Sequence, residues 1–324
     1  MRTLQRLKAH LKKHSSIRTK KECTLPAVSV IMPVYNRASV VRRAIDSVLG
    51  QDFADFELIV VDDASTDSTA ETVEQVGDPR LRLIRLDANG GGNSARNRGI
   101  REARSPLIAF LDSDDYYLPQ KLSVVERTFR ERPDLDVLID SFIKVYPETD
   151  GRQDTPRRNP VVDTNEAFLE ALFMRRIWKG TPGISARRDA AIRAGLFDET
   201  LNRRQDYDFI VRLAAVARCA ATDELLWVKT NSPDAISANF DTGAASLVNF
   251  HQRRSQFHGH AAYRRGFALD VARHFNRLVS RRRFDRLARD ARLLIDVLGF
   301  RGFLVALIEG WRLRSARKRQ ISGR

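Results

Sequence analysis

Residues 56–69 read FELIVVDDASTDST and join an apolar, β-branched run directly to a cluster of carboxylates and hydroxyls. A nearly continuous Val/Ile/Leu run is typical of a strand that is buried on both faces, as in a parallel sheet. The run ends in Asp62 and Asp63, and open α/β sheets bind ligands at the carboxyl ends of their strands. This stretch therefore predicts a central strand that delivers acidic side chains to a binding cleft.

The pattern repeats on both sides of this stretch. We expect further strands at 27–34, 81–87 and 106–112, separated by segments of helical period at 38–49, 66–76 and 93–104. Strands that alternate with helices predict right-handed βαβ units and an α/β fold with a mostly parallel central sheet. Later in the sequence we expect helices at 118–131, 164–174 and 205–217, strands at 135–146 and 220–229, and an exposed loop at 147–163.

Polar residues follow each of the four expected strands, on what should be one edge of the sheet. They are Pro33, Tyr35, Asn36 and Arg37 after the first, Asp62, Asp63, Ser65 and Asp67 after the second, the run 89–93 (NGGGN) after the third, and Asp112, Ser113, Asp114 and Asp115 after the fourth. Tyr35 suits either stacking on a base or filling the rim of the core. We expect a ligand site here.

The segment LDSDD, residues 111–115, places three carboxylates within four residues. Such a cluster repels itself unless a cation or protons compensate. Mg²⁺ or Mn²⁺ takes one or two carboxylates and completes its shell with substrate phosphates and water. The alternative is that Asp114 or Asp115 caps the helix that begins near residue 118.

Two further features admit both a functional and a structural interpretation. The glycine run opens a helix that holds Arg96 and Arg98, which favours anion binding but also suits an ordinary tight turn. No P-loop motif is present, and no dinucleotide fingerprint follows the first strand. Asp206, near the start of the helix in RRQDYDFIVRL (203–213), is either a helix-start acid or a general base.

Composition narrows the classes of protein. The 324 residues are 43% hydrophobic and 30% charged, as in globular proteins. No uncharged apolar run is long enough to span a membrane, and the basic N-terminus lacks the apolar core of a secretory signal. Two cysteines exclude a disulfide framework and fit a reducing compartment, so we expect a cytoplasmic protein. With no histidine between residues 15 and 250, a Ser-His-Asp triad in the middle of the chain is excluded.

The net charge of +15 lies at the two ends of the chain: +7 over residues 1–24, −6 over 25–249 and +14 over 250–324. We expect a basic arm at 1–25, a catalytic domain at 26–239 and a basic helical C-terminal region at 240–324. In that region Phe300, Phe303, Leu304, Leu307, Ile308 and Trp311 recur at helical spacing. This face suits peripheral attachment to the cytoplasmic surface of an anionic membrane, or packing onto the body.

Six segments together resemble the family 2 glycosyltransferases, which are inverting enzymes with the nucleotide-sugar fold called GT-A. The segments are VSVIMPVYNR (28–37), FELIVVDDASTDST (56–69), NGGGNSARNRGI (89–100), LIAFLDSDDYYLPQKL (107–122), GLFDETL (195–201) and RRQDYDFIVRL (203–213). They occur in the family's order over about residues 27–230. The resemblance implies a Rossmann-like GT-A domain followed by a helical extension, and a metal-dependent hexosyltransferase.

The resemblance also implies a role for each matching residue. Pro33, Tyr35, Asn36, Asp63, Arg96, Asp112 and Ser113 would bind the nucleotide sugar, with Asp63 on the base; Asp114 and Asp115 would bind Mg²⁺ or Mn²⁺; and Asp206 would be the catalytic base. The family usually has an acid before that base, where this chain has Gln205. A UDP-sugar is the expected donor, and a saccharide or lipid-linked saccharide of cell-surface polysaccharide or glycolipid synthesis is the expected acceptor.

Two other functions compete with this one. A non-enzymatic protein that binds membrane or nucleic acid through its basic ends would show salt-dependent affinity and no nucleotide-diphosphate site. The strand-end carboxylates argue against nucleic acid, which is not an expected partner. A sugar nucleotidyltransferase would carry a Gly-rich run with Arg or Lys after the first strand, which PVYNRASV (33–40) lacks.

Overall fold

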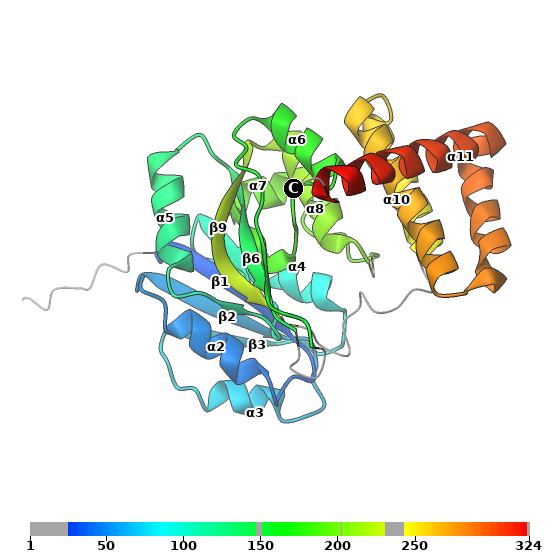
Figure 1. The fold of residues 1–324 in the computed structure, drawn as a ribbon. Helices are drawn as coiled ribbons and strands as arrows, with labels where there is room; N and C mark the ends of the chain where they lie inside the picture. Colours follow the sequence, from blue (N-terminus) through cyan, green and yellow to red (C-terminus); the bar gives the residue numbers. More distant parts are fainter. Residues whose placement is uncertain (1–24, 147–150, 202, 231–242, 323–324) are drawn as a thin grey trace, which may run out of the picture.

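The computed structural model of the chain describes residues 25–146, 151–201, 203–230 and 243–322, with side chains up to residue 316. The basic arm expected at 1–25 thus lies almost wholly outside the described residues. The sheet has the strand order β3-β2-β1-β4-β8-β6-β9-β5, and β7 pairs with β6 at the side. Figure 1 shows this curved sheet flanked by helices, with the C-terminal helices gathered at one side.

The N-terminal half is the predicted run of parallel strands. Strands β1 (Val28–Val34), β2 (Phe56–Asp62), β3 (Leu81–Arg85) and β4 (Leu107–Phe110) are linked by α2 (Val41–Leu49), α3 (Thr69–Glu74) and α4 (Gly92–Glu102). Successive residues of β1 face opposite sides: Ile31 packs with Ala95 and Ile100 of α4, whereas Val30 and Met32 pack in the core that holds α2. Burial on both faces explains why these strands are uninterrupted apolar runs.

The second half of the sheet is mixed. Strand β8 (Ile184–Arg187) lies antiparallel between β4 and β6 (Val137–Lys144), and β9 (Cys219–Lys229) runs parallel to β6. The short strands β5 (Tyr116–Tyr117) and β7 (Thr155–Arg157) pair with β9 and β6. Three helices complete this half at or near their predicted places: α5 (Lys121–Glu131), α6 (Asn165–Phe173) and α8 (Gln205–Val216). Strands β5, β7 and β8 and the short helix α7 (Arg188–Arg193) were not predicted.

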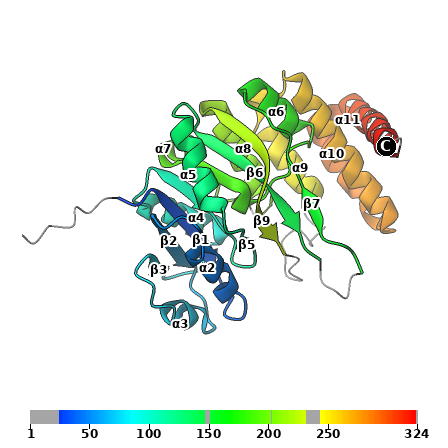
Figure 2. The ribbon, with the colours of Figure 1, turned by 60° about the vertical axis from the view of Figure 1, so that its left-hand side comes forward.

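The C-terminal helices α9 (Gly243–Gln252), α10 (Ala261–Ser280) and α11 (Phe284–Ser322) pack on the body. Tyr263 and Phe250 belong to the main core, and Phe250 stacks on Tyr207 of α8 with ring centroids 4.7 Å apart. Gly266 lets α10 approach α6 closely, because a Cβ there would lie 2.0 Å from the Phe173 carbonyl oxygen. Figures 1 and 2 show α10 and α11 together on the side of the body that carries α6.

The apolar face predicted between residues 300 and 311 is partly buried and partly exposed. Phe303 is buried and lies 5.5 Å from Phe275 of α10, ring centroid to ring centroid. A second row remains exposed and comprises Phe300, Leu304, Ile308 and Trp311. Helix α11 is interrupted at Gly299, where φ is 69°. Among the helices of the described residues, none has the length and apolar character needed to cross a membrane.

Candidate active site

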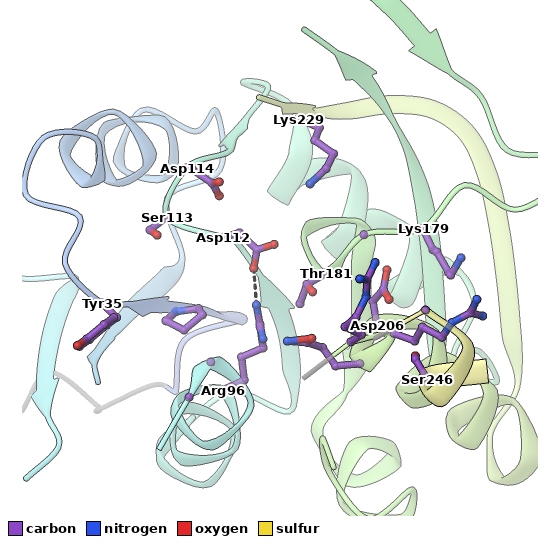
Figure 3. A pocket seen from close by; sticks show the side chains of 18 of the residues that line it. Tyr35, Arg96, Asp112, Ser113, Asp114, Lys179, Thr181, Asp206, Lys229 and Ser246 are labelled. Atoms are coloured by element: carbon purple, nitrogen blue, oxygen red, sulfur yellow. Dashed lines mark hydrogen bonds and ion pairs between the residues drawn. The ribbon is translucent and has the colours of Figure 1, made fainter. Parts of the chain in front are cut away.

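A cavity of about 800 Å³ opens where the carboxyl ends of β1, β2 and β4 meet the first turns of α4 and α8. Helices α9 and α10 supply its far wall. Eight of the predicted site residues line it: Pro33, Tyr35, Asp63, Arg96, Asp112, Ser113, Asp114 and Asp206. Figure 3 shows Tyr35, Arg96 and residues 112–114 on one side of the cavity and Asp206 on the other.

The glycine loop is held by Asp63. Each carboxylate oxygen of Asp63 accepts one backbone N–H, from Gly90 and from Gly91, at 2.8 Å. Gly91 has a φ of 85°, a conformation that favours glycine, and a Cβ on Gly90 would lie 2.8 Å from the Ser94 hydroxyl oxygen. The structure therefore gives Asp63 a loop-positioning contact, and its predicted contact with a base would use the remaining acceptor capacity of its oxygens.

Asn36 does not line the cavity. Its side-chain oxygen accepts the backbone N–H of Thr66 at 2.8 Å, and its own N–H donates to the Ser65 hydroxyl at 2.9 Å. These bonds tie the loop after β1 to the loop after β2. Asn36 thus holds the loop that carries the half-exposed Tyr35, and its predicted contact with the nucleotide sugar stays a prediction.

Arg96 and Asp112 form an ion pair, with the Nη2–Oδ1 distance at 2.7 Å. The Arg96 side chain is largely buried, and its guanidinium lies over the Phe197 ring, 5.5 Å from the centroid. The pair is drawn as the dashed line in Figure 3. It fixes the Asp112 carboxylate at the cavity wall and keeps a cation beside it.

The neighbouring acids Asp114 and Asp115 point to different places. Asp114 lines the cavity, and burial followed by the charge of Asp112 raises its pKa above the ordinary value. Asp115 does not line the cavity; its Oδ1 accepts the Thr230 N–H at 2.9 Å and its Oδ2 lies 3.7 Å from the Lys229 ammonium. Burial raises the pKa of Asp115 to about 8. Asp115 thus anchors the end of β9, and its predicted metal contact has no support in this geometry.

Asp112 and Asp114 are the acids of this wall that could contact a divalent cation. In the described parts of the chain, no group of three or more His, Cys, Asp or Glu side chains could hold a metal. Two hard carboxylates at one wall nevertheless fit Mg²⁺ or Mn²⁺ that completes its shell with phosphate oxygens and water. Burial, and then the charge of Asp112, raises the pKa of Asp114, and a bound cation would favour its ionised form.

Asp206 lies in the first turn of α8, behind Arg204, whose φ of 61° marks the sharp turn into the helix. Its Oδ1 accepts the N–H of Tyr207 at 2.7 Å, which leaves Oδ2 for other contacts. In Figure 3 its carboxylate faces Thr181 and the Lys179 segment on the cavity side of the helix. A carboxylate with an open oxygen in a cavity can accept a proton from a bound hydroxyl.

Sequence reasoning missed the basic wall of the cavity. Arg175, Lys179, Arg203, Arg204, Arg273, His274 and Arg277 line it, together with Asp270 of α10. Asp270 pairs with both Arg175 and Arg204, and although burial would raise its pKa, these arginines lower it far below the ordinary range. One signal was available: Asp270 is the single acid of residues 261–280 and sits in the apolar run FALDVA, where an acid needs a buried partner.

Comparison with known proteins identifies the family of the chain. The model of the family described as "Glycosyl transferase family 2" matches residues 29–200, more than half of the chain. The chain therefore belongs to glycosyl transferase family 2, as its motifs predicted, and the enzyme class is that of the glycosyltransferases.

Similar curated proteins include the succinoglycan biosynthesis protein ExoO of Rhizobium meliloti, 36% identical over 60% of this chain and 58% of that protein. The uncharacterized glycosyltransferase EpsJ of Bacillus subtilis is 31% identical over 66% of this chain and 63% of its own length. The chain thus spans about three fifths of the length of these relatives.

Solved structures share the fold. A crystal structure of S. aureus TarS 1–349 in complex with UDP-GlcNAc matches with a TM-score of 0.68 at 22% identity, over 84% of this chain and 80% of that one. The mannosyltransferase PcManGT from Pyrobaculum calidifontis, in complex with GDP-Man and Mn²⁺, matches with a TM-score of 0.57 at 18% identity, over 92% of this chain and 88% of that one. The predicted GT-A fold with C-terminal helices is confirmed.

Proposed function

We propose that the chain is an inverting, metal-dependent hexosyltransferase that moves a sugar from a nucleotide-diphosphate sugar, with a UDP-sugar as the expected donor, to a hydroxyl of a saccharide or lipid-linked saccharide. Its product would belong to a cell-surface polysaccharide or glycolipid. The observation that carries the proposal is that Asp206 faces the Asp112 and Asp114 carboxylates across one cavity. The names of the relatives and the donors bound in the solved neighbours support the same class of reaction.

The reaction follows from this placement. The acceptor oxygen forms a bond to the anomeric carbon while the bond from that carbon to the donor diphosphate breaks on the opposite face. Asp206 takes the hydroxyl proton as the oxygen attacks. Asp112 and Asp114 would hold Mg²⁺ or Mn²⁺, which supplies positive charge beside the diphosphate. Pro33 and Tyr35, which line the cavity at the end of β1, would contact the base.

A donor panel tests this proposal together with its metal requirement. Purified protein incubated with UDP-, GDP- or dTDP-sugars and Mn²⁺ is expected to release nucleoside diphosphate from one donor class. EDTA, or the variant Asp114→Asn, should weaken donor affinity by about 10–100-fold, because the diphosphate would lose the cation that offsets its charge. Asp46→Asn, an exposed acid of α2 outside the cavity, is the matched control. Full turnover in EDTA would contradict the assignment of Asp112 and Asp114.

The exposed row on α11 favours attachment to an anionic membrane surface. Phe300 and Trp311 are 62% and 49% exposed, and Arg301 and Arg312 lie beside them on exposed positions. Apolar side chains next to cations are what an interfacial helix uses to enter the headgroup region. A lipid-linked acceptor would be reached from that surface.

Vesicle sedimentation tests this attachment. Phe300→Ser combined with Trp311→Ser is expected to weaken binding to vesicles with 30% anionic lipid by at least about 10-fold, since each side chain contributes on the order of 1.5–3 kcal/mol when buried. Ile192→Ser, an exposed apolar residue of α7, is the control. Unchanged binding by the double variant, or by a chain that lacks residues 298–324, would reject the attachment.

A further inference from the structure

The cavity has two halves of different charge. In the half at the strand ends, three cations (Arg37, Arg96 and Lys229) face three carboxylates (Asp63, Asp112 and Asp114). The opposite half, which we call the basic half, is lined by Arg175, Lys179, Arg203, Arg204, Arg273 and Arg277, with Asp206 and Asp270 as its acids. Formal charge is therefore balanced in the first half. In the second half, the four cations Arg175, Lys179, Arg203 and Arg204 exceed the two acids by two, without counting Arg273 and Arg277, which have other interactions.

The acids of the basic half do not neutralise it. Asp270 is shared by Arg175 and Arg204, so that this group of three keeps one positive charge. Asp206 offsets one more cation. Among the described residues that line this half, no other carboxylate is present. The surplus belongs to the cavity itself, because these side chains converge there from three segments of the chain: 175–179, 203–204 and α10.

Two of these cations have pKa values that burial and neighbouring positive charges lower. Burial, and then the charge of Arg175, lowers the pKa of Lys179 to about 8, against the opposing pull of Asp206 and Asp270. Burial, and then Arg204 and Arg277, lowers the pKa of Arg203. The Arg203 Nη1 atom is also buried without a hydrogen-bond partner. Partly buried cations that repel one another, one of which has a donor without a partner, suit the binding of an anion.

We propose that the basic half binds a phosphate-type anion of the acceptor, a diphosphate or a phosphodiester, through Lys179 and Arg203, and thereby presents the acceptor hydroxyl to Asp206. This inference rests on the proposed function and names the class of its acceptor. A surplus of two positive charges fits a diphosphate or a chain of phosphodiesters better than a single carboxylate, which would offset only one. The donor diphosphate belongs to the opposite half, where Asp112 and Asp114 need a metal.

Pyrophosphate in EDTA is a direct probe. Without metal, Asp112 and Asp114 repel the probe from the strand-end half, so calorimetry should report one saturable site in the basic half. The double variant Lys179→Gln/Arg203→Gln is expected to weaken this binding by at least about 10-fold, since hydrogen bonds to charged groups are worth about 1.5–3 kcal/mol each. Arg176→Gln, an exposed neighbour paired with Glu170 and outside the cavity, should stay within about twofold. Lys179→Arg, which keeps the charge, checks that a loss does not reflect misfolding.

No saturable binding by the wild-type protein, or equal binding by the double variant, would overturn the proposal. Transfer assays then identify the source of the phosphate: a saccharide on a short prenyl diphosphate represents the lipid-linked acceptor, and an oligo(glycerol phosphate) represents the phosphodiester chain. For the acceptor that the enzyme uses, the double variant should raise KM at least about 10-fold, while KM for a neutral oligosaccharide is unchanged. An equal rise in KM for the phosphate-bearing and the neutral acceptor contradicts the proposal. Donor hydrolysis by the wild-type protein tests the proposed function separately, because it needs no acceptor.

Discussion

Asp206→Asn is expected to reduce sugar transfer by about 10²–10⁴-fold, the usual contribution of a positioned general base. An amide cannot take the proton of the acceptor hydroxyl, but it can still accept the Tyr207 N–H that now binds Oδ1. The local structure of α8 and the affinity for the donor should therefore stay as they are. The measurement is single-turnover transfer with saturating donor, accompanied by a donor-binding titration.

The competing interpretation of Asp206 is that it only stabilises the first turn of its helix. In that case the substitution would cost about 0.3–1 kcal/mol of stability and leave transfer intact. Asp189→Asn is the matched control, because Asp189 is an exposed acid in the first turn of α7, outside the cavity. Transfer by Asp206→Asn at a rate near that of the wild type would remove the residue from the role of base.

Lys121→Met is expected to lower the free energy of unfolding by about 3–5 kcal/mol, since it leaves a buried carboxylate unpaired. Lys121, in the first turn of α5, and Asp140, in β6, are both fully buried and form an ion pair that joins the helix to the sheet. Burial raises the pKa of Asp140 to about 7, even with the Lys121 ammonium beside it. Urea denaturation at several pH values measures the loss.

The pH dependence of this variant has a definite sign. In the folded state the pKa of Asp140 lies above its ordinary value of 3.8, and removing Lys121 raises it further. The folded wild type and the folded variant both hold this proton between pH 4 and 7, so both lose stability over that range. The destabilisation of the variant relative to the wild type grows as the pH rises above 7, where Asp140 of the wild type ionises beside Lys121 and that of the variant does not. Lys121→Met/Asp140→Leu, which removes both charges, should recover most of the stability. A double variant as unstable as the single one would contradict this account.

The parallel half of the sheet and the position of the cleft could be predicted from the sequence. Over residues 27–112 the strands are apolar runs separated by segments of helical period, so that the periodicity and the apolar character of the sequence indicate the same elements. The predicted carboxylates follow these strands directly, and strand geometry alone brings Asp63, Asp112 and Asp114 to one wall. Strand β5, of two residues, is too short to show a period, and it forms by pairing with the distant strand β9.

The amino-acid sequence by itself determined the βαβ order, the family and the set of acids at the strand ends, because local periodicity and adjacency in the chain carry that information. Only the tertiary structure decided which acid of a pair faces the cavity. Asp114 enters it and Asp115 is drawn away by Thr230, a residue 115 positions further along. The basic half was likewise invisible in the sequence, since Lys179, Arg203 and α10 meet only when helices far apart in the chain pack on one core. Side-chain direction and summed charge depend on such long-range contacts, which no local pattern encodes.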